Sequence, residues 1–176
     1  MAIIVQKFGG TSVADATKIR NVAKRIVRTH EEGNHPVVVV SAMGDTTDRL
    51  THLASEVSAN PPERELAVLL STGEQVSIAL LAMAVSELGH QAVSLTGTQV
   101  GLITGGFYSE ARIQHINETR ILSELEQGKI VILAGFQGVS IDNEITTLGR
   151  GASDTTATAI AATLGADRCE IYTDVD

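Results

Sequence analysis

Disulfide bonds are excluded as a source of stability, because the 176-residue chain has a single cysteine, Cys169. Tryptophan is missing and aromatic residues make up only 3% of the chain, so aliphatic side chains must form the core. With 43% apolar residues, a chain of this length can build a core without a metal or a cross-link. We therefore expect one domain over residues 1–176, in which Cys169 is a buried strand thiol in a reducing compartment.

Positive charge is scarce as well. Lysine and arginine total 13 against 21 acidic residues, a formal net charge of -8. Such a charge disfavours binding to nucleic acid or to anionic membranes, so neither partner is expected. Residues 1–7 have no basic segment followed by a long apolar stretch, and no run approaches the roughly 20 apolar residues of a membrane span. These absences predict a cytoplasmic protein.

Metal-ligand spacing is also lacking among the five histidines, so no metal site is expected. Two nucleotide signatures are missing too. The chain has no G-x-x-x-x-G-K-[ST] segment, and the glycines around Arg150 do not extend to G-x-G-x-x-G. A P-loop and a dinucleotide-binding fingerprint are therefore both excluded.

Short β-rich apolar runs alternate with longer helical patterns. Expected strands are Ile3–Phe8, Pro36–Ala42, Ala92–Leu95, Ile130–Ala134 and Glu170–Thr173. Expected helices are Asp15–Glu32, a stretch opened by Pro61, Gly73–Leu88, Asn117–Glu126 and Ala152–Leu164. Val37–Val40 and Ile130–Leu133 are continuously apolar, as in central strands covered on both faces. The pattern predicts an α/β fold with a mainly parallel sheet flanked by helices, and shorter, antiparallel strands within Thr96–Ile116.

The clearest candidate for phosphate binding is the turn after the first strand, which contains Lys7, Gly9, Gly10, Thr11 and Ser12. Paired glycines let backbone N–H groups approach phosphate oxygens, and a lysine can neutralise charge on a transferred phosphoryl group. The alternative is a tight strand-to-helix turn with a solvated lysine.

Three further polar loops follow strands or open helices. Ser41–Asp48 can bind an anion, but Asp45, Thr46 and Thr47 are also common helix caps. Glu74 can receive an ammonium group, or it can simply favour a helix dipole.

Arg150 in the third loop can hold a carboxylate through two hydrogen bonds, while Ser153 and Asp154 beside it can serve only as a cap. All these loops fall at the carboxyl edge of the sheet, where ligands bind in open α/β folds. One lysine, one arginine and one glutamate at that edge match phosphoryl transfer onto an amino acid.

Six segments resemble aspartate kinase, and they occur in the expected order over nearly the whole chain. These segments are Lys7–Val13 (KFGGTSV), Ser41–Asp48 (SAMGDTTD), Ser71–Gln75 (STGEQ), Gly135–Gly138 (GFQG), Thr146–Thr156 (TTLGRGASDTT) and Tyr172–Val175 (YTDV). The resemblance is to the N-terminal part of the catalytic domain. It implies the three-layer α/β/α fold of the amino-acid kinase superfamily.

The resemblance also implies a reaction: ATP, with Mg²⁺, phosphorylates the β-carboxylate of L-aspartate in lysine, threonine and methionine biosynthesis. Lys7 and Asp154 would be catalytic, the second by orienting the first. Aspartate would be held by Thr46, Thr47, Glu74, Arg150, Gly151 and Ser153. ATP would be bound by Lys7, Gly9, Gly10, Ser12, Ser41, Thr173 and Asp174. Homo-oligomers, or assembly with other aspartate kinase subunits, would be expected.

Two departures from the family pattern stand out. Ala152 replaces the usual second glycine after the Gly-Arg-Gly segment, which adds a methyl group at a helix start. The chain also ends at Asp176, before the stretch that in the family completes the nucleotide site and before the regulatory ACT domains. We therefore expect a truncated catalytic domain with weak nucleotide binding and no feedback regulation. The alternatives are a silent fragment that acts only in assembly, or another kinase of the superfamily.

Overall fold

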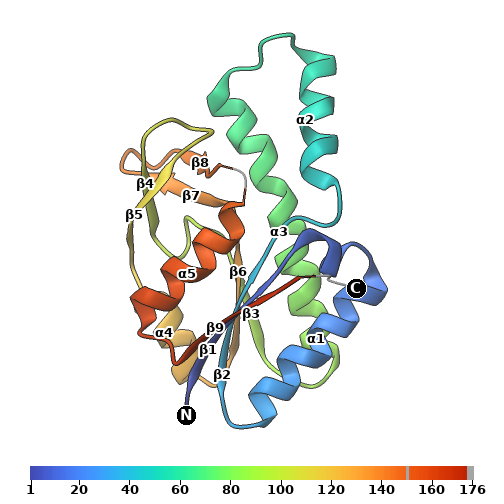
Figure 1. Ribbon diagram of the computed structural model, residues 1–176, viewed down its shortest axis with the longest axis vertical. Coiled ribbons are helices and arrows are strands. Elements are labelled where there is room, and N and C mark those ends of the chain that lie inside the picture. Colours follow the sequence, from blue (N-terminus) through green and yellow to red (C-terminus); the bar gives the residue numbers. More distant parts are fainter. Residues whose placement is uncertain (150, 174–176) are drawn as a thin grey trace.

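A five-stranded parallel sheet forms the centre of the computed structural model, which describes residues 1–149 and 151–173 (Figure 1). Its strands are β1 (Ile3–Phe8), β2 (His35–Val40), β3 (Ala92–Leu95), β6 (Ile130–Ala134) and β9 (Arg168–Tyr172), in the order β3-β6-β2-β1-β9. All four pairings are parallel, with Val5 of β1 opposite Val37 of β2. The expected strands are therefore present; β1, β3 and β6 have the expected ends, and the ends of β2 and β9 differ by one or two residues.

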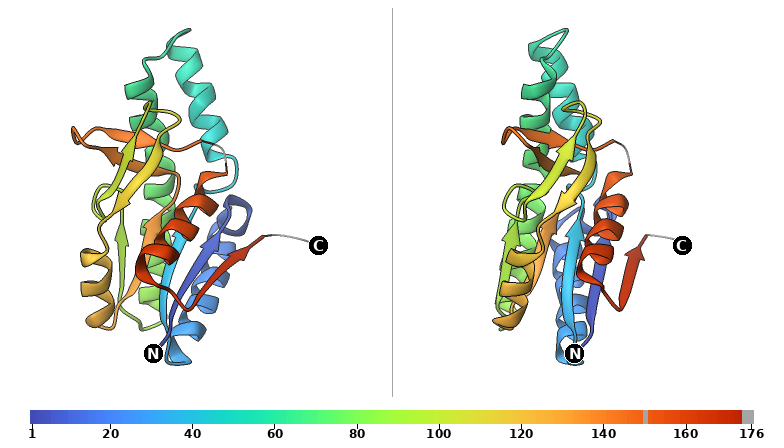
Figure 2. Two further views of the ribbon diagram at one scale, coloured as in Figure 1. Left: turned by 60° about the vertical axis from the view of Figure 1, so that its left-hand side comes forward. Right: turned by 90° about the vertical axis from the view of Figure 1, so that its left-hand side faces the viewer.

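Helices cover both faces of this sheet (Figure 2). On one face, α1 (Ala16–Glu31) and α3 (Glu63–Glu87) pack on Val38 and Val40 of β2. On the other, α4 (Thr119–Glu126) and α5 (Ala152–Leu164) pack near Val37 and Val39. Since successive side chains of a strand point to opposite faces, the unbroken valine run feeds two separate cores. The three-layer α/β/α prediction is confirmed.

Local signals set several of the helix ends. The Asp15 side chain accepts a hydrogen bond from the Lys18 amide at 2.9 Å and so caps α1, as helix starts require. At the C-terminal end of α5, Gly165 adopts the left-handed conformation (φ 58°), which glycine enters at little cost. These two ends lie where the sequence predicts them.

A second, four-stranded sheet lies beyond the carboxyl end of the first, at the upper left of Figure 1. It has the order β5-β4-β7-β8 and consists of β4 (Leu102–Gly105), β5 (Arg112–Ile116), β7 (Gln137–Ser140) and β8 (Ile145–Thr147). The antiparallel pair β4–β5 is confirmed. β7 and β8 are missing from the sequence prediction, because each has only three or four residues and no long apolar run.

The sequence predicts two helices here, one opened by Pro61 and one over Gly73–Leu88, and this prediction is wrong. A single helix of 25 residues, α3, takes their place at the top of Figure 1. Gly73 lies inside this helix, where a side chain would collide with Ala42 (2.9 Å between Cβ atoms). α2 (Thr46–Val57) packs beside α3 and has no buried residue.

α3 is also the one helix among the described residues that is long and apolar enough to cross a membrane, contrary to the sequence expectation. Within the apolar 18-residue stretch that gives α3 this property, 44% is buried inside the protein. The helix packs against α1, β3 and β6. Core packing therefore accounts for its composition.

Cys169 is a second correction, because its side chain is exposed rather than buried. It lies on β9, which is the edge strand of the five-stranded sheet in the described part of the chain. An edge strand has a neighbour on one side only, so its residues are covered less completely than those of β2.

Candidate functional site

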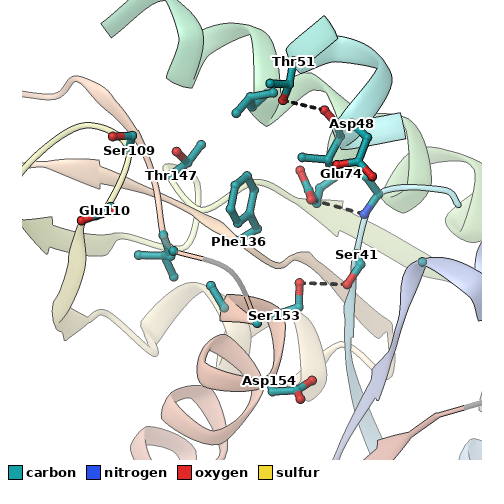
Figure 3. Close-up of a pocket in the computed structure, with 18 of the residues that line it drawn as sticks. Ser41, Asp48, Thr51, Glu74, Ser109, Glu110, Phe136, Thr147, Ser153 and Asp154 are labelled. Atoms are coloured by element: carbon teal, nitrogen blue, oxygen red, sulfur yellow. Dashed lines mark hydrogen bonds between the residues drawn. The ribbon is translucent and has the colours of Figure 1, made fainter. Parts of the chain in front are cut away.

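A cavity of about 610 Å³ opens where the carboxyl ends of β1 and β2 meet α2, α3 and the start of α5 (Figure 3). Its volume suits a small-molecule site. The predicted site residues that line it are Lys7, Gly10, Ser41, Thr47, Glu74, Gly151, Ser153 and Asp154. Residues as far apart in the sequence as Lys7 and Asp154 thus meet at one edge of the sheet, as the strand order requires.

Lys7 marks one end of the cavity. It is the last residue but one of β1, and its side chain is only 11% exposed. Its Nζ lies 2.7 Å from Oδ1 of Asp154, which stands in the first turn of α5. The interpretation of Lys7 as a merely solvated lysine is therefore wrong.

The glycines after Lys7 allow a close approach of two loops. A Cβ on Gly10 would lie 2.7 Å from the Ala42 carbonyl oxygen, and a Cβ on Gly9 would lie 3.4 Å from Lys7 Nζ. The Gly44 amide donates to the Gly10 carbonyl at 2.9 Å, which fixes the turn against the β2–α2 loop. Glycine is required here because any side chain at position 10 would push these loops apart.

Two serines join the end of β2 to the start of α5. Ser41 Oγ donates to Ser153 Oγ at 2.9 Å, and Figure 3 shows both side chains at the cavity wall. The N-cap of α5 is Gly151, in the left-handed conformation (φ 76°), and no side chain caps this helix. The interpretation of Ser153 and Asp154 as simple caps is therefore wrong.

Glu74 marks the other end of the cavity. Its side chain is almost completely buried (2% exposed), and Oε1 accepts a hydrogen bond from the Ala42 amide at 3.2 Å. Oε2 has no hydrogen-bond partner among the described residues. Burial raises the pKa of Glu74 to about 7, although the hydrogen bond from the Ala42 amide opposes the rise. A carboxylate left in this state favours a cationic ligand.

The helix-dipole interpretation of Glu74 is wrong, because the residue lies well inside α3, which begins at Glu63. A carboxylate gains from the dipole only within the first turn. The capping interpretation of the β2–α2 loop is confirmed in position only. Asp45 is the N-cap of α2, but its side chain makes no cap hydrogen bond, and the Thr46 hydroxyl donates to the Met43 carbonyl at 2.5 Å.

The remaining predicted residues lie elsewhere. Ser12 and Thr173 line a second cavity of about 300 Å³, together with Phe8, Lys18, Asn21, Val22, Arg25 and Tyr172. Thr46 and Gly9 line neither cavity. Arg150 and Asp174 lie outside the described residues.

Several residues of the cavity wall were not predicted as site residues. Asp48 and Thr51 come from α2, Ser109 and Glu110 from the loop after β4, and Phe136 from the turn between β6 and β7 (Figure 3). Phe136 has a positive φ of 70°, which is rare for a bulky residue. Its place in the Gly135–Gly138 segment was the local signal, whereas the β4 loop reaches the cavity through tertiary folding alone.

The charges of the cavity are unequal. Lys7 is the one cation among its described lining residues, and the acidic ones are Asp48, Glu74, Glu110 and Asp154. No three His, Cys, Asp or Glu side chains in the described part of the chain cluster closely enough to hold a metal ion. The arrangement can bind an anion at Lys7 and an ammonium group at Glu74.

Comparisons with known proteins agree with this geometry. The model of the amino acid kinase family matches residues 2–176. The chain is 59% identical to the aspartokinase of Mycobacterium tuberculosis over 177 aligned residues, which cover all of this chain and 42% of that protein. It is also 59% identical to the aspartokinase of Geobacillus stearothermophilus, covering 99% of this chain and 43% of that protein.

Solved structures give the same result. Aspartate kinase from Synechocystis superposes with a TM-score of 0.83 at 55% identity, over 99% of this chain and 28% of that one. Escherichia coli aspartokinase III in complex with aspartate and ADP superposes with a TM-score of 0.87 at 27% identity, over 98% and 49%. The chain spans less than half the length of these relatives. The resemblance to aspartate kinase is confirmed, and the chain belongs to the amino acid kinase family.

Proposed function

We propose that the protein transfers the γ-phosphate of ATP to the β-carboxylate of L-aspartate, giving 4-phospho-L-aspartate. The observation that carries this proposal is the placement of Lys7 and Glu74 on the wall of one cavity. The similarity to aspartokinases along the whole chain supports the choice of substrate. A role in lysine, threonine and methionine biosynthesis, and a cytoplasmic location, belong to the same proposal.

Aspartate would bind with its ammonium group at Glu74, whose Oε2 has no partner of its own in the described residues. Thr47, Gly151 and Ser153 line the wall around it, and Thr46 and Arg150 complete the proposed set. Because the β-carboxylate is already ionised near neutral pH, it can attack phosphorus without a general base. Catalysis would then depend on positioning and on charge stabilisation.

Lys7 would stabilise the charge on the transferring phosphoryl group, and Asp154 would orient it through their 2.7 Å ion pair. Gly9, Gly10, Ser12 and Ser41 would bind phosphate oxygens. Thr173 and Asp174 would face the nucleotide. In support, the second cavity contains Ser12 and Thr173 together with the cations Lys18 and Arg25, which suit a polyanion.

Mg²⁺ would arrive with ATP, since this ion usually keeps its waters and is held by the phosphates and one or two carboxylates. The described residues fit that mode better than a protein-only metal centre, because no group of three metal-binding side chains is found among them. Bound Mg²⁺ would neutralise charge on the phosphates. Asp154 is the carboxylate nearest to Lys7 that such a complex would meet.

The direct test is aspartate-dependent release of ADP by this chain, with glutamate and N-acetylglutamate as competing acceptors. The same assay should be run on the chain completed with the remaining part of the Geobacillus stearothermophilus aspartokinase. We expect aspartate to be the preferred acceptor, with much higher turnover in the completed protein. Equal turnover with glutamate would favour another kinase of the family, and no turnover in either form would contradict the proposal.

We also propose that two copies associate through α3. Val76, Leu80 and Met83 are 50%, 37% and 65% exposed, and their spacing places them on one face of the helix. This face borders an apolar groove between α1 and α3, with Arg20 and Glu87 among its walls. Arg20 and Glu87 give this groove charges of both signs, which a second copy related by two-fold symmetry would match with its own.

Light scattering tests this association. The protein should be a dimer, and Met83→Glu should be monomeric but still folded, with the far-UV circular dichroism spectrum of the wild type and a lower melting temperature because the dimer no longer stabilises it. A monomeric wild-type protein at micromolar concentration would contradict the proposal.

A further inference from the structure

Gln137 is a buried polar residue for which the proposed reaction assigns no role. It opens β7 of the second sheet, and only 3% of its surface is exposed. Its Nε2 donates a hydrogen bond to the Ser71 carbonyl of α3 at 2.9 Å. A buried amide is costly unless it is hydrogen-bonded, so this contact between strand and helix accounts for a glutamine at a core position.

The backbone around Gln137 is rigid. Gln137 pairs with Thr147 of β8, and a Cβ on Gly97 would lie 2.5 Å from the Gln137 carbonyl oxygen. A Cβ on Gly138 would lie 2.6 Å from the Thr104 methyl group on β4. Contacts this close leave the strand little room to shift, so the Gln137 side chain starts from a fixed point.

Ser71 precedes Glu74 by three residues, so both lie on the same face of α3. The Ala42 amide, which donates to Glu74 Oε1 at 3.2 Å, lowers the pKa of Glu74 against the larger effect of burial, and the Gln137 amide beside the same turn acts in the same direction. The other charged groups around the cavity are Lys7 on β1, Asp48 on α2, Glu110 in the loop after β4, and Asp154 on α5. Because three of these four are acidic, neutral donors carry much of the stabilisation of the Glu74 charge.

We propose that Gln137 is a positioning residue for Glu74: through its hydrogen bond to the Ser71 carbonyl it ties the Ser71–Glu74 turn of α3 to the second sheet. It thereby holds the Glu74 carboxylate against the Ala42 amide and places it for the ammonium group of the acceptor. The last step rests on the proposed function, whereas the first concerns only the contact between Gln137 and α3.

The test replaces Gln137 by methionine, which has a similar length and no amide, and by asparagine, which keeps an amide too short to reach Ser71. The first readout is the pH titration of the Glu74 carboxyl carbon by NMR, assigned with Glu74→Gln. The second is aspartate affinity by calorimetry between pH 6 and 8.5. Thr104→Val is the matched control, because it removes a buried hydrogen bond to Thr146 in the same sheet.

We expect both Gln137 variants to titrate Glu74 at a pH higher by about one unit. Without its anchor the turn should hold the Ala42 amide less well against the Glu74 carboxylate, and a hydrogen bond to a charged group is worth roughly tenfold. Aspartate affinity should fall about tenfold at pH 7 and recover in part at pH 8.5. Thr104→Val should lower the melting temperature and leave both readouts unchanged.

An unshifted Glu74 titration in both variants would overturn the inference, as would an equal shift in Thr104→Val. Should one Gln137 variant fail to fold, the other decides. A shifted titration in a protein whose wild type binds no aspartate would refute the proposed function and leave the positioning role of Gln137 intact.

Discussion

The two ends of the cavity hold their charges in opposite ways. At the lysine end, Lys7 is already paired with Asp154 at 2.7 Å, and the Asp154 side chain is 49% exposed. At the glutamate end, Glu74 is 2% exposed and forms no ion pair with any described residue. The positive charge of Lys7 is therefore neutralised before a ligand binds, whereas the carboxylate of Glu74 has no cationic partner among the described residues. An ammonium group bound at Glu74, as proposed above, would therefore gain from pairing with a buried charge that has no partner.

The packing of α3 explains this difference. Ser71, Gly73 and Ser77 are all buried in the same part of α3 as Glu74, and Gly73 lets the helix approach Ala42 of the β2–α2 loop closely. Water is excluded from the carboxylate as a result. Lys7, by contrast, lies where a strand ends beside the exposed first turn of α5, so its partner stays hydrated.

The largest effect is expected at the lysine end, from Lys7→Ala. Loss of one donor that stabilises a transition state typically lowers turnover by about 10²- to 10³-fold, or roughly 2.7 to 4 kcal/mol. The measurement is aspartate-dependent ADP release at saturating aspartate in the completed protein. Arg28→Ala, which removes an exposed cation from the last turn of α1, is the control and should leave turnover unchanged. Near-normal turnover in Lys7→Ala would remove Lys7 from the mechanism.

The next effect concerns Glu74 and the pH dependence of stability. Its pKa is about 7 in the folded protein and 4.5 in the unfolded chain, so the folded state binds the proton more tightly. Its contribution to stability is therefore greatest below pH 4.5 and is lost as pH rises through 7, by about 3 kcal/mol in total.

Glu74→Gln should remove this loss. The variant should be more stable than wild type at pH 8 by about that amount and nearly equal at pH 4, as measured by urea unfolding. Aspartate should reduce the difference in unfolding free energy between the two proteins at pH 8, because it should bind to and stabilise the wild type alone. Parallel pH profiles for the two proteins would mean that the Glu74 charge is compensated, and the contrast between the two ends would disappear.

The sequence predicts the parts of the fold that have strong periodicity. Val37–Val40 could be assigned to a central strand because four consecutive apolar residues need cover on both faces, and Asp15 and Gly165 carry clear capping chemistry. β7 and β8 could not be predicted, because their side chains contact residues that are distant in the sequence and come together only in the folded chain. Gln137 is an example, since its partner Ser71 lies 66 residues away.

The sequence placed some residues at the cavity and misplaced others for related reasons. Lys7, Ser41, Ser153 and Asp154 could be found because strand ends in a parallel sheet share one edge. Cys169 was placed wrongly because an apolar-flanked strand does not reveal whether it lies at the edge of its sheet. Burial of Glu74 was equally invisible, because it depends on how closely α3 approaches Ala42.

The smallest effect is expected from Asp154→Asn. Because this carboxylate is half exposed, its pair with Lys7 should contribute less than about 1 kcal/mol to the free energy of unfolding. A double-mutant cycle with Lys7→Met measures that coupling directly from urea unfolding at low and high salt. Coupling above about 2 kcal/mol that persists in high salt would show that the lysine end is as strongly desolvated as the glutamate end. Weak, salt-sensitive coupling would instead mean that Asp154 serves mainly to aim the Lys7 ammonium group into the cavity, where a ligand anion can compete for it.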